Sequence, residues 1–522
     1  MGTPIPQNHA AFSLGEITEI TGGMLAGGAP ADPITGVSTD TRALGRGALF
    51  VALAGERFDG HAHLEAAFAR GAAAALVDRE VAAPRGLAII RVGSTLSALG
   101  AIARAHARRW RALGSPEPIG GEPRGRPSSE GRTIVAITGS AGKTTTRVAL
   151  TALLERLRPG VVHAASGNLN NQIGVPMVLL GLEARHHYAV VEVGTNSSGE
   201  IAALARMIEP DAAVLTLIAM AHCEGLGSLD AVAAEKGALF AALPPGGLAV
   251  GNADDARVQR ELGRGPARRS TYGAHEHADL RIAARTIDGI TRSRVRLERR
   301  RDGSSIDFTA PLVGEAGALA CAAAIAVTEE ILGEQVTGEV ASEAFARADV
   351  GGGAGRLVPR VLADGLVLVD DSYNANPASS CASIRAAAEI AAATGRRLTL
   401  VLGEMRELGD EAARGHAQVG RAAAESGAAH VIGVAGLARL IVDEVRARGI
   451  LASFAEDLAE ATRVVLGSVG PGDVVLVKGS RGVATERIVR AILDAHGEPA
   501  EAGDRSPRGG DASALETVRG AP

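Results

Sequence analysis

The stretch VAITGSAGKTTTRV, residues 135–148, is the starting point for predicting the fold. An apolar, β-branched run (residues 133–138) leads into a turn of small residues, and a Lys-Thr pair then opens a helix. The general phosphate-binding loop, G-x-x-x-x-G-K-[ST], has its first glycine where this chain has Ile137. The spacing here is T-G-S-A-G-K-T, so the stretch is either a damaged general loop or the intact loop of a narrower class.

The residue types in this turn suit the binding of phosphate groups. Gly139 and Gly142 allow backbone N–H groups to approach phosphate oxygens at a helix N-terminus. Lys143 supplies positive charge for the β- and γ-phosphates, and the hydroxyl of Thr144 is a ligand suited to Mg²⁺. A glycine-rich turn without a ligand is the alternative, but the strand before it and the G-K-T-T-T run favour phosphate binding.

The residues after the loop alternate apolar strands with helical patterns. The runs TIVAIT, YAVVEVG, AAVLTLI and GLAVGN are typical of strands buried on both faces. Helical patterns such as GEIAALARMI separate them. This alternation predicts an α/β domain with a parallel sheet and right-handed crossovers.

Composition and spacing divide the 522 residues into three blocks and two flexible pieces. The segment 113–132 is rich in Gly, Pro, Ser and charge, which indicates a flexible linker. The last segment is polar, and we expect it to be disordered. The predicted order is an N-terminal domain (12–112), the linker (113–132), a central domain (133–333), a C-terminal domain (334–497) and a tail (498–522).

The overall charge and the cysteine content narrow the class of protein. A net charge of −5 with 2% aromatic residues argues against a general nucleic-acid binder. The three cysteines, Cys223, Cys321 and Cys381, lie too far apart for a disulfide framework. We find no signal-peptide pattern and no uncharged run of membrane length, so we expect a cytoplasmic protein.

Two further polar residues follow predicted strands of the central domain. Glu192 ends the run VVEV, and His222 follows the strand that leads into AMAHCEG. The carboxyl ends of parallel strands share one edge of a sheet, so both residues should lie near Thr144. A buried carboxylate such as that of Glu192 requires a partner or a metal ion. Because Thr144, Glu192 and His222 should share one sheet edge, we favour a metal site there over the alternative that His222 is a solvated surface residue. Lys236 lies on a predicted helix, and the sequence pattern around it predicts no function for this lysine.

With these features the chain resembles the Mur ligase family, whose members use ATP to join amino acids to the UDP-N-acetylmuramoyl precursor of peptidoglycan. The family's loop is T-G-[ST]-x-G-K-[ST], so the loop in this chain is intact for that family. The resemblance covers residues 12–495 without the linker. The matching motifs are STDTRALGRGALFVALAGERFDGHAH (38–63), SGNLNNQIGVP (166–176), DDSYNANP (370–377), GEMRELG (403–409) and LVKGSR (476–481).

The resemblance implies an N-terminal UDP-binding α/β domain, a central P-loop ATPase-like parallel-sheet domain and a C-terminal Rossmann-like domain. The motifs are most similar to the branch that adds D-alanyl-D-alanine to UDP-N-acetylmuramoyl-tripeptide. In that reaction the tripeptide carboxylate attacks the γ-phosphate of ATP, and the dipeptide amine then attacks the resulting acyl phosphate. The resemblance also implies ATP, two Mg²⁺ ions and a carbamylated lysine, and we expect a monomer.

The resemblance assigns roles to individual residues. The catalytic residues implied are Lys143, Glu192, His222 and Lys236. The metal ligands implied are Thr144, Glu192, His222 and, if carbamylated, Lys236. The ATP-binding residues implied are Gly139, Ser140, Ala141, Gly142, Lys143, Thr144, Thr145, Arg356, Asp371 and Asn374. The substrate-binding residues implied are Ser38, Asp40, Thr41 and Arg42 for the UDP end, with Asn168, Asn170, Asn171, Asn376 and Lys478. For the three asparagines at 168–171, a turn stabilised by its own side chains is a competing explanation.

One segment departs from the family. In PLVGEAGALACAAAIAV (311–327), Ala316, Gly317 and Ala320 stand where the family usually has His, Asn and Asn on the adenine side. Two alternatives therefore stay open. One is another Mur or folylpolyglutamate-type ligase, and the other is a nucleotide-binding regulator with weakened catalysis. Phosphate release separates the regulator from a ligase.

Overall fold

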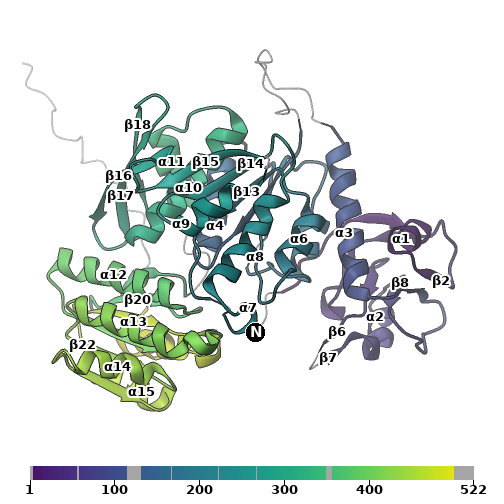
Figure 1. The fold of residues 1–522 in the computed structure, drawn as a ribbon. Helices are drawn as coiled ribbons and strands as arrows, with labels where there is room; N and C mark the ends of the chain where they lie inside the picture. Colours follow the sequence, from purple (N-terminus) through teal and green to yellow (C-terminus); the bar gives the residue numbers. More distant parts are fainter. Residues whose placement is uncertain are drawn as a thin grey trace, which may run out of the picture.

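The chain forms three α/β domains in a row, with the central domain between the other two (Figure 1). The predicted tail after residue 498 and most of the predicted linker lie outside the described residues. Among the helices in the described ranges, none has the length and apolar character that a membrane crossing needs. The computed structural model describes residues 4–55, 58–114, 131–165, 167–221, 223–265, 267–348 and 355–498.

The N-terminal domain is built on a five-stranded sheet whose strands are parallel except for one antiparallel edge strand, β2. Two short antiparallel pairs, β1 with β3 and β6 with β7, lie beside it. In sheet order the strands are β2 (Met24–Ala26), β9 (Ala88–Arg91), β8 (Ala74–Val77), β5 (Leu49–Val51) and β4 (Val37–Ser38). The other elements are β1 (Ala11–Ser13), β3 (Pro33–Thr35), β6 (Ala54–Gly55), β7 (Phe58–Asp59), α1 (Leu14–Thr21), α2 (Leu64–Ala69), α3 (Thr95–Ala112), η1 (Thr41–Ala43) and η2 (Gly60–His63).

The central domain has a nine-stranded sheet whose parallel part confirms the predicted parallel sheet, with an antiparallel extension that was not predicted. β10 to β16 run parallel, whereas β16, β17 and β18 form an antiparallel extension. In sheet order the strands are β11 (Val162–Ala164), β12 (Tyr188–Glu192), β10 (Thr133–Thr138), β13 (Ala212–Leu215), β14 (Leu248–Asn252), β15 (Arg268–Gly273), β16 (Leu280–Asp288), β17 (Arg292–Arg299) and β18 (Ser305–Ala310). The helices are α4 (Lys143–Leu157), α5 (Gly174–Leu180), α6 (Glu200–Ile208), α7 (Cys223–Leu226), α8 (Leu229–Ala241), α9 (Ala256–Leu262), α10 (Gly314–Leu332) and α11 (Gly338–Arg347).

Strand β10 is buried on both faces because its side chains alternate between two apolar layers. Ile134 and Ala136 pack with α3, α5, α6 and α8, while Val135 and Ile137 pack with α4 and α10. Burial on both faces explains why the strand is an uninterrupted apolar run. It also fixes the start of α4 at the carboxyl edge of the sheet.

Helix α11 corrects the predicted domain boundary. The boundary between residues 333 and 334 would place this helix in the C-terminal domain, but it packs on α4 and β18. Phe345 contributes to this packing, because it is fully buried and its ring contacts that of Phe308 in a tilted arrangement with the centroids 5.5 Å apart. Residues 338–347 therefore belong to the central domain.

The C-terminal domain has a six-stranded sheet that is parallel except for the edge strand β19. The strands in sheet order are β19 (Val358–Val361), β20 (Val367–Asp371), β24 (Val474–Lys478), β21 (Leu398–Gly403), β22 (His430–Val434) and β23 (Ala452–Ala455). The helices are α12 (Pro377–Thr394), α13 (Ala412–Glu425), α14 (Ala438–Arg446), α15 (Leu458–Leu466), α16 (Glu486–His496), η3 (Gly409–Glu411) and η4 (Arg481–Val483).

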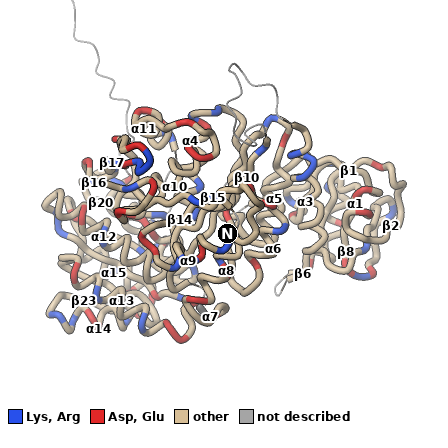
Figure 2. The backbone as a smooth tube through the Cα atoms, turned by 45° about the horizontal axis from the view of Figure 1, so that its top comes forward, with Lys and Arg blue, Asp and Glu red and all other residues tan. Residues whose placement is uncertain are grey.

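The C-terminal domain rests on the central domain through polar and apolar contacts. The two Nη atoms of Arg285 on β16 donate to the carboxylate of Glu389 on α12 at 2.8 and 2.7 Å. Val313, just before α10, is buried in the core of the C-terminal domain. Acidic and basic residues are interspersed over all three domains (Figure 2), and Arg296 in the arginine-rich strand β17 pairs with Asp307 at 2.8 Å.

Candidate active site

A cavity of about 1030 Å³ opens along the carboxyl edge of the central sheet. The C-terminal domain forms one wall, and Leu96 of α3 contributes from the N-terminal side. The structure therefore brings together residues that the sequence places far apart. The predicted residues that line it are Ser140, Ala141, Gly142, Lys143, Thr144, Thr145, Asn168, Asn170, Asn171, Glu192, Arg356, Asp371, Asn374, Asn376 and Lys478.

The loop between β10 and α4 has the form that a phosphate-binding turn requires. Gly139 has φ +149°, and a Cβ there would meet the hydroxyl of Thr216 at 1.9 Å, so only glycine fits. Gly142, with φ +82°, precedes the first turn of α4. The Nζ of Lys143 donates to the carbonyl of Gly139 at 2.8 Å. Burial lowers the pKa of Lys143, and the charge of Glu192 opposes this shift.

Glu192, at the end of β12, lies against the start of α4. Its carboxylate is 3% exposed and accepts hydrogen bonds from the hydroxyl of Thr144 and the Nδ2 of Asn170, both at 2.9 Å. The Nε of Arg147 is 3.5 Å from the same carboxylate. Arg147 was not among the predicted site residues, although its position one helical turn after Lys143 on α4 was a usable signal.

The asparagines before α5 divide into two kinds. Asn170 also donates to the side-chain oxygen of Asn168 at 2.7 Å, so these two residues extend the polar surface around Glu192. Asn171 accepts from the backbone N–H groups of Ile173 and Gly174 at 3.1 and 2.8 Å. The self-stabilised turn thus applies to Asn171, while Asn170 faces the carboxylate.

Lys236 on α8 does not line the cavity, but it lies close enough to Lys143 in the cavity wall for the two charges to interact. The residue is 1% exposed. Burial, with a smaller contribution from the charge of Lys143, lowers the pKa of Lys236 to about 7. The predicted residue His222 lies outside the described residues. Within the ranges that the structure describes, no group of three or more His, Cys, Asp and Glu side chains is placed to hold a metal ion.

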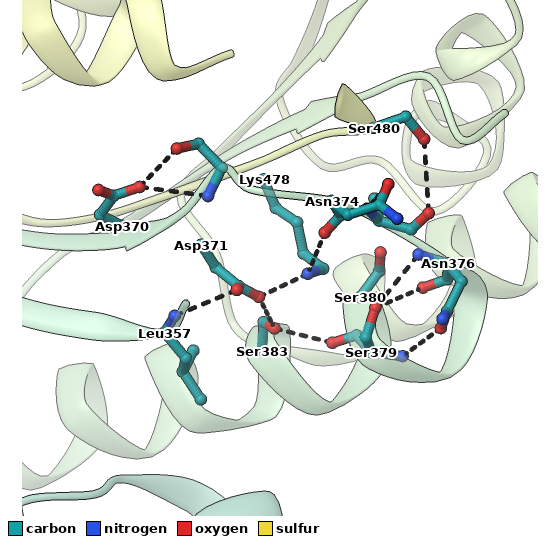
Figure 3. A network of polar contacts seen from close by, with 12 residues as sticks. Leu357, Asp370, Asp371, Asn374, Asn376, Ser379, Ser380, Ser383, Lys478 and Ser480 are labelled. Atoms are coloured by element: carbon teal, nitrogen blue, oxygen red, sulfur yellow. Dashed lines mark hydrogen bonds and ion pairs between the residues drawn. The ribbon is translucent and has the colours of Figure 1, made fainter. Parts of the chain in front are cut away.

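The C-terminal wall is organised around Asp371, at the end of β20 (Figure 3). The Nζ of Lys478 on β24 donates to Asp371 at 2.5 Å and to the carbonyl of Asn374 at 3.0 Å. The hydroxyl of Ser383 and the backbone N–H of Leu357 also donate to Asp371. Burial raises the pKa of Asp371, and Lys478 opposes this rise.

Asn376 and Arg356 lie near the pair of Asp371 and Lys478, on the side of the loop between β10 and α4. Asn376 accepts from Ser379 at the start of α12, and its Nδ2 donates to the carbonyl of Ser140 at 3.2 Å. The guanidinium of Arg356 lies 4.0 Å from the ring centre of Tyr373, a cation–π contact. Tyr373 also lines the cavity and was not predicted, although it lies within the DDSYNANP motif.

The predicted UDP-binding residues lie outside the cavity, at the sheet edge of the N-terminal domain that faces α5. The hydroxyl of Ser38 accepts from the backbone N–H of Asp40 at 3.1 Å. Arg42 binds the carboxylate of Asp40 through Nε and Nη2 at 3.0 and 2.7 Å. Thr41 begins the short helix η1. Strand β4, which contains Ser38, contacts α5 of the central domain.

The segment that departs from the family keeps its helix, as α10, and its first turns line the cavity through Ala316, Gly317 and Ala320. A Cβ on Gly317 would meet the Cβ of Leu312 at 2.7 Å, so the close turn before the helix favours glycine there. The missing polar side chains therefore leave small apolar residues next to Glu315, which also lines the cavity, and the helix is unbroken.

Three matches to known domains cover most of the chain. Residues 33–107 match the Mur ligase family catalytic domain, residues 137–328 the Mur ligase middle domain, and residues 355–481 the glutamate ligase domain of Mur ligases.

Full-length relatives agree with these matches. The UDP-N-acetylmuramoyl-tripeptide–D-alanyl-D-alanine ligase of Escherichia coli is 36% identical over 93% of this chain and 99% of its own length. The enzyme of the same name from Bacillus subtilis is 31% identical over 88% and 93%. A crystal structure of MurF from Acinetobacter baumannii has a TM-score of 0.78 at 27% identity, covering 94% of this chain and 100% of that one. MurF of Thermotoga maritima in complex with ADP has a TM-score of 0.73 at 25% identity, covering 88% and 97%. The chain belongs to the Mur ligase family.

Proposed function

We propose that the protein is an ATP-dependent amide ligase that joins D-alanyl-D-alanine to UDP-N-acetylmuramoyl-tripeptide, forming the pentapeptide precursor of peptidoglycan. The observation that carries this proposal is the contact between Glu192 and Thr144 at the mouth of an intact phosphate loop, inside a cavity walled by the C-terminal domain. The names and nearly full coverage of the relatives support the choice of substrates.

The layout of the cavity suits a reaction between two anions. The phosphate loop and α4 lie at its centre, where Lys143 and Arg356 supply positive charge for the phosphates. Asn168 and Asn170 lie on the side of β12, toward the N-terminal domain, and are our candidates for the peptide end of the nucleotide sugar. Ser38, Asp40, Thr41 and Arg42 are our candidates for the UDP end.

The proposed chemistry has two steps. A carboxylate oxygen of the tripeptide bonds to the γ-phosphorus as the bond to the β-phosphate oxygen breaks, which yields an acyl phosphate and ADP. The dipeptide amine then bonds to the acyl carbon, phosphate leaves with the original carboxylate oxygen, and the amine loses a proton. Lys143 offsets the charge that builds up on the phosphates in the first step.

The oxygen donors at the loop fit a magnesium ion. Thr144 and Glu192 present a hydroxyl and a carboxylate in contact with each other, and Mg²⁺ prefers oxygen ligands. When bound, Mg²⁺ neutralises charge on the phosphates. We propose that His222 and a carbamylated Lys236 serve a second ion. A lysine with a pKa of about 7 is partly neutral at physiological pH, which carbamylation requires.

We also propose a cytoplasmic monomer. The use of ATP and a nucleotide sugar supports the compartment, and the C-terminal domain of the same chain walls the cavity at the central sheet.

The test is product formation followed by mass spectrometry, with ATP, Mg²⁺, D-alanyl-D-alanine and UDP-N-acetylmuramoyl-tripeptides that carry diaminopimelate or lysine. We expect the pentapeptide product and equal amounts of ADP only when all substrates are present. Lys143→Ala is the inactive control. Product with glutamate or a different amino acid instead of the dipeptide would favour another ligase of the family. Nucleotide binding without phosphate release would favour a regulator.

A further inference from the structure

Two buried polar side chains of the cavity have no role in the reaction described above. Asn252 ends β14 and Tyr272 lies near the end of β15, and they are direct partners in the parallel register of these strands. Their relative exposures are 4% and 1%, and both line the cavity. Partners in adjacent parallel strands point to the same face of the sheet, so the two side chains lie next to each other.

Each of these side chains has an unused hydrogen-bonding group. The Oδ1 of Asn252 accepts from the backbone N–H of Asp254 at 2.9 Å, and Asn252 lines the cavity with its Nδ2 still available as a donor. The hydroxyl of Tyr272 has no hydrogen-bond partner within the part of the chain that the structure describes, nor has the Nδ2 of Asn252. Neither atom is among the fully buried, unpartnered side-chain atoms of the described residues, so both atoms are open to the cavity and available to a ligand.

The position of the pair matches the base of a nucleotide held by the phosphate loop. The sheet order runs β10, β13, β14, β15, so Tyr272 is three strand spacings from the loop, or about 14 Å. This is the scale of an extended nucleoside triphosphate between its phosphates and its base. The opposite direction, toward β12, leads to Asn170 and the N-terminal domain, where we place the sugar nucleotide.

The surroundings of the pair suit a flat ring. Leu312, Leu319 and Ala320 line the same cavity, and α10 packs against β14 and β15. Ala316 and Gly317 in the first turn of α10 offer contact area but no side-chain hydrogen bonds, whereas Glu315 beside them also lines the cavity and, when ionised, can only accept. On the sheet side of the ring, Asn252 supplies a donor and Tyr272 a hydroxyl.

We infer that Asn252 and Tyr272 are specificity-determining residues that bind the edge of the adenine ring, a role that rests on the proposed use of ATP. Asn252 donates from Nδ2 to a ring nitrogen, and the oxygen of Tyr272 accepts from the exocyclic amine. Burial, with smaller contributions from the carboxylates of Asp254 and Asp255, raises the pKa of Tyr272, so the hydroxyl stays protonated. The same negative charge favours an amine over a carbonyl at this position, and hence adenine over hypoxanthine.

The test is calorimetric binding of ADP, inosine diphosphate and pyrophosphate to the full chain. Tyr272→Phe removes only the hydroxyl, and Asn252→Asp keeps the oxygen that accepts from Asp254 while removing the donor. We expect each variant to bind ADP about 3- to 10-fold more weakly, the scale of one lost hydrogen bond, with pyrophosphate binding unchanged. The preference for ADP over inosine diphosphate should also shrink in Tyr272→Phe.

Tyr188→Phe is the matched control, because Tyr188 starts β12 on the same sheet and does not line the cavity. Its ADP affinity should equal that of the unsubstituted protein. ADP affinity unchanged in Tyr272→Phe, or a parallel loss of pyrophosphate affinity, would overturn this inference alone. Failure of the unsubstituted protein to bind ADP would overturn the proposed function as well.

Discussion

Glu192 and Asp371 both end a buried parallel strand at the same cavity, yet their surroundings differ. Asp371 is paired with the ammonium of Lys478 at 2.5 Å and accepts two further hydrogen bonds. Glu192 accepts from the hydroxyl of Thr144 and the amide of Asn170, and its nearest cation, Arg147, is 3.5 Å away. One carboxylate is hydrogen-bonded to its counter-ion, whereas the other is hydrogen-bonded only by neutral donors and has a guanidinium 3.5 Å away.

The difference separates an organising role from a ligand-binding role. A buried carboxylate in direct contact with a lysine holds its loop in place but has little capacity left for a second cation. We expect Asp371 and Lys478 to shape the wall that carries Tyr373 and Asn374. Glu192 contacts a residue of the phosphate loop itself, so we expect it to act directly on the cation that accompanies the phosphates.

Removal of the lysine should break the organising pair. Lys478→Met leaves Asp371 buried without its counter-ion, and we expect a loss of about 3–5 kcal/mol in the free energy of unfolding of the C-terminal domain. Urea denaturation measures this. The double variant with Asp371→Asn should recover part of the loss, whereas equal stability of Lys478→Met and the unsubstituted protein would show that the pair is not structural.

Loss of the other carboxylate should affect the reaction rather than the fold. We expect Glu192→Gln to lower the rate of ligation about 100-fold, the scale for one charge-stabilising group, and to raise the Mg²⁺ concentration needed for half-maximal rate. Steady-state kinetics over a magnesium series checks both effects. A rate within a few-fold of normal, with unchanged stability, would contradict the assignment of Glu192.

The lowered pKa of Lys236 predicts a pH dependence of both the stability and the ligation rate. The unfolded amine titrates at about 10.4, and burial lowers the folded pKa to about 7. The unfolded state therefore binds more protons between these values, so the contribution of Lys236 to stability increases as pH rises through that window. Above pH 7 the folded amine is mostly neutral and able to react with CO₂. We expect bicarbonate to increase the ligation rate several-fold at pH 8, with no such increase in Lys236→Arg.

The smallest expected effect comes from weakening the contact between the C-terminal domain, which carries Asp371, and the central domain. Arg285→Ala removes the bidentate contact with Glu389, a partly exposed pair worth about 0.5–1 kcal/mol. We expect a rise of about 2- to 5-fold in the KM for ATP, with a fall of at most about 4 °C in the melting temperature. Arg296→Ala, which breaks the exposed pair with Asp307 on the same sheet, should leave KM unchanged.

Much of the fold could be predicted because β10, β12, β13 and β14 are apolar runs that end in recognisable loops. Within the central domain the predicted strands stop at β14, since the arginine-rich β17 (RSRVRLER) has the polar composition of a loop even though its alternate residues are buried. Helix α11 carries no signal of the domain on which it packs. The pairing of β14 with β15, the pairing of β17 with β18 and the packing of α11 against α4 can be seen only in the folded structure.

The site shows the same limit. The motifs located Lys143, Glu192 and Asp371, but the pairing of Asp371 with Lys478 joins residues 107 positions apart, and the register that places Asn252 beside Tyr272 has no local signature. One overlooked signal was compositional. The chain has only three lysines, Lys143, Lys236 and Lys478, among 54 basic residues, and all three lie at or beside the cavity. Arginine cannot replace a lysine that must be neutral or fit a compact buried pair.

The most direct test of the central claim is the fate of the carboxylate oxygen. UDP-N-acetylmuramoyl-tripeptide labelled with oxygen-18 in its terminal carboxylate would be incubated with ATP, Mg²⁺ and D-alanyl-D-alanine, and the released phosphate analysed by mass spectrometry. An acyl phosphate formed at the loop between β10 and α4 predicts one labelled oxygen in each phosphate released, and none with Lys143→Ala, which should release no phosphate. Unlabelled phosphate released together with the pentapeptide product would contradict the account.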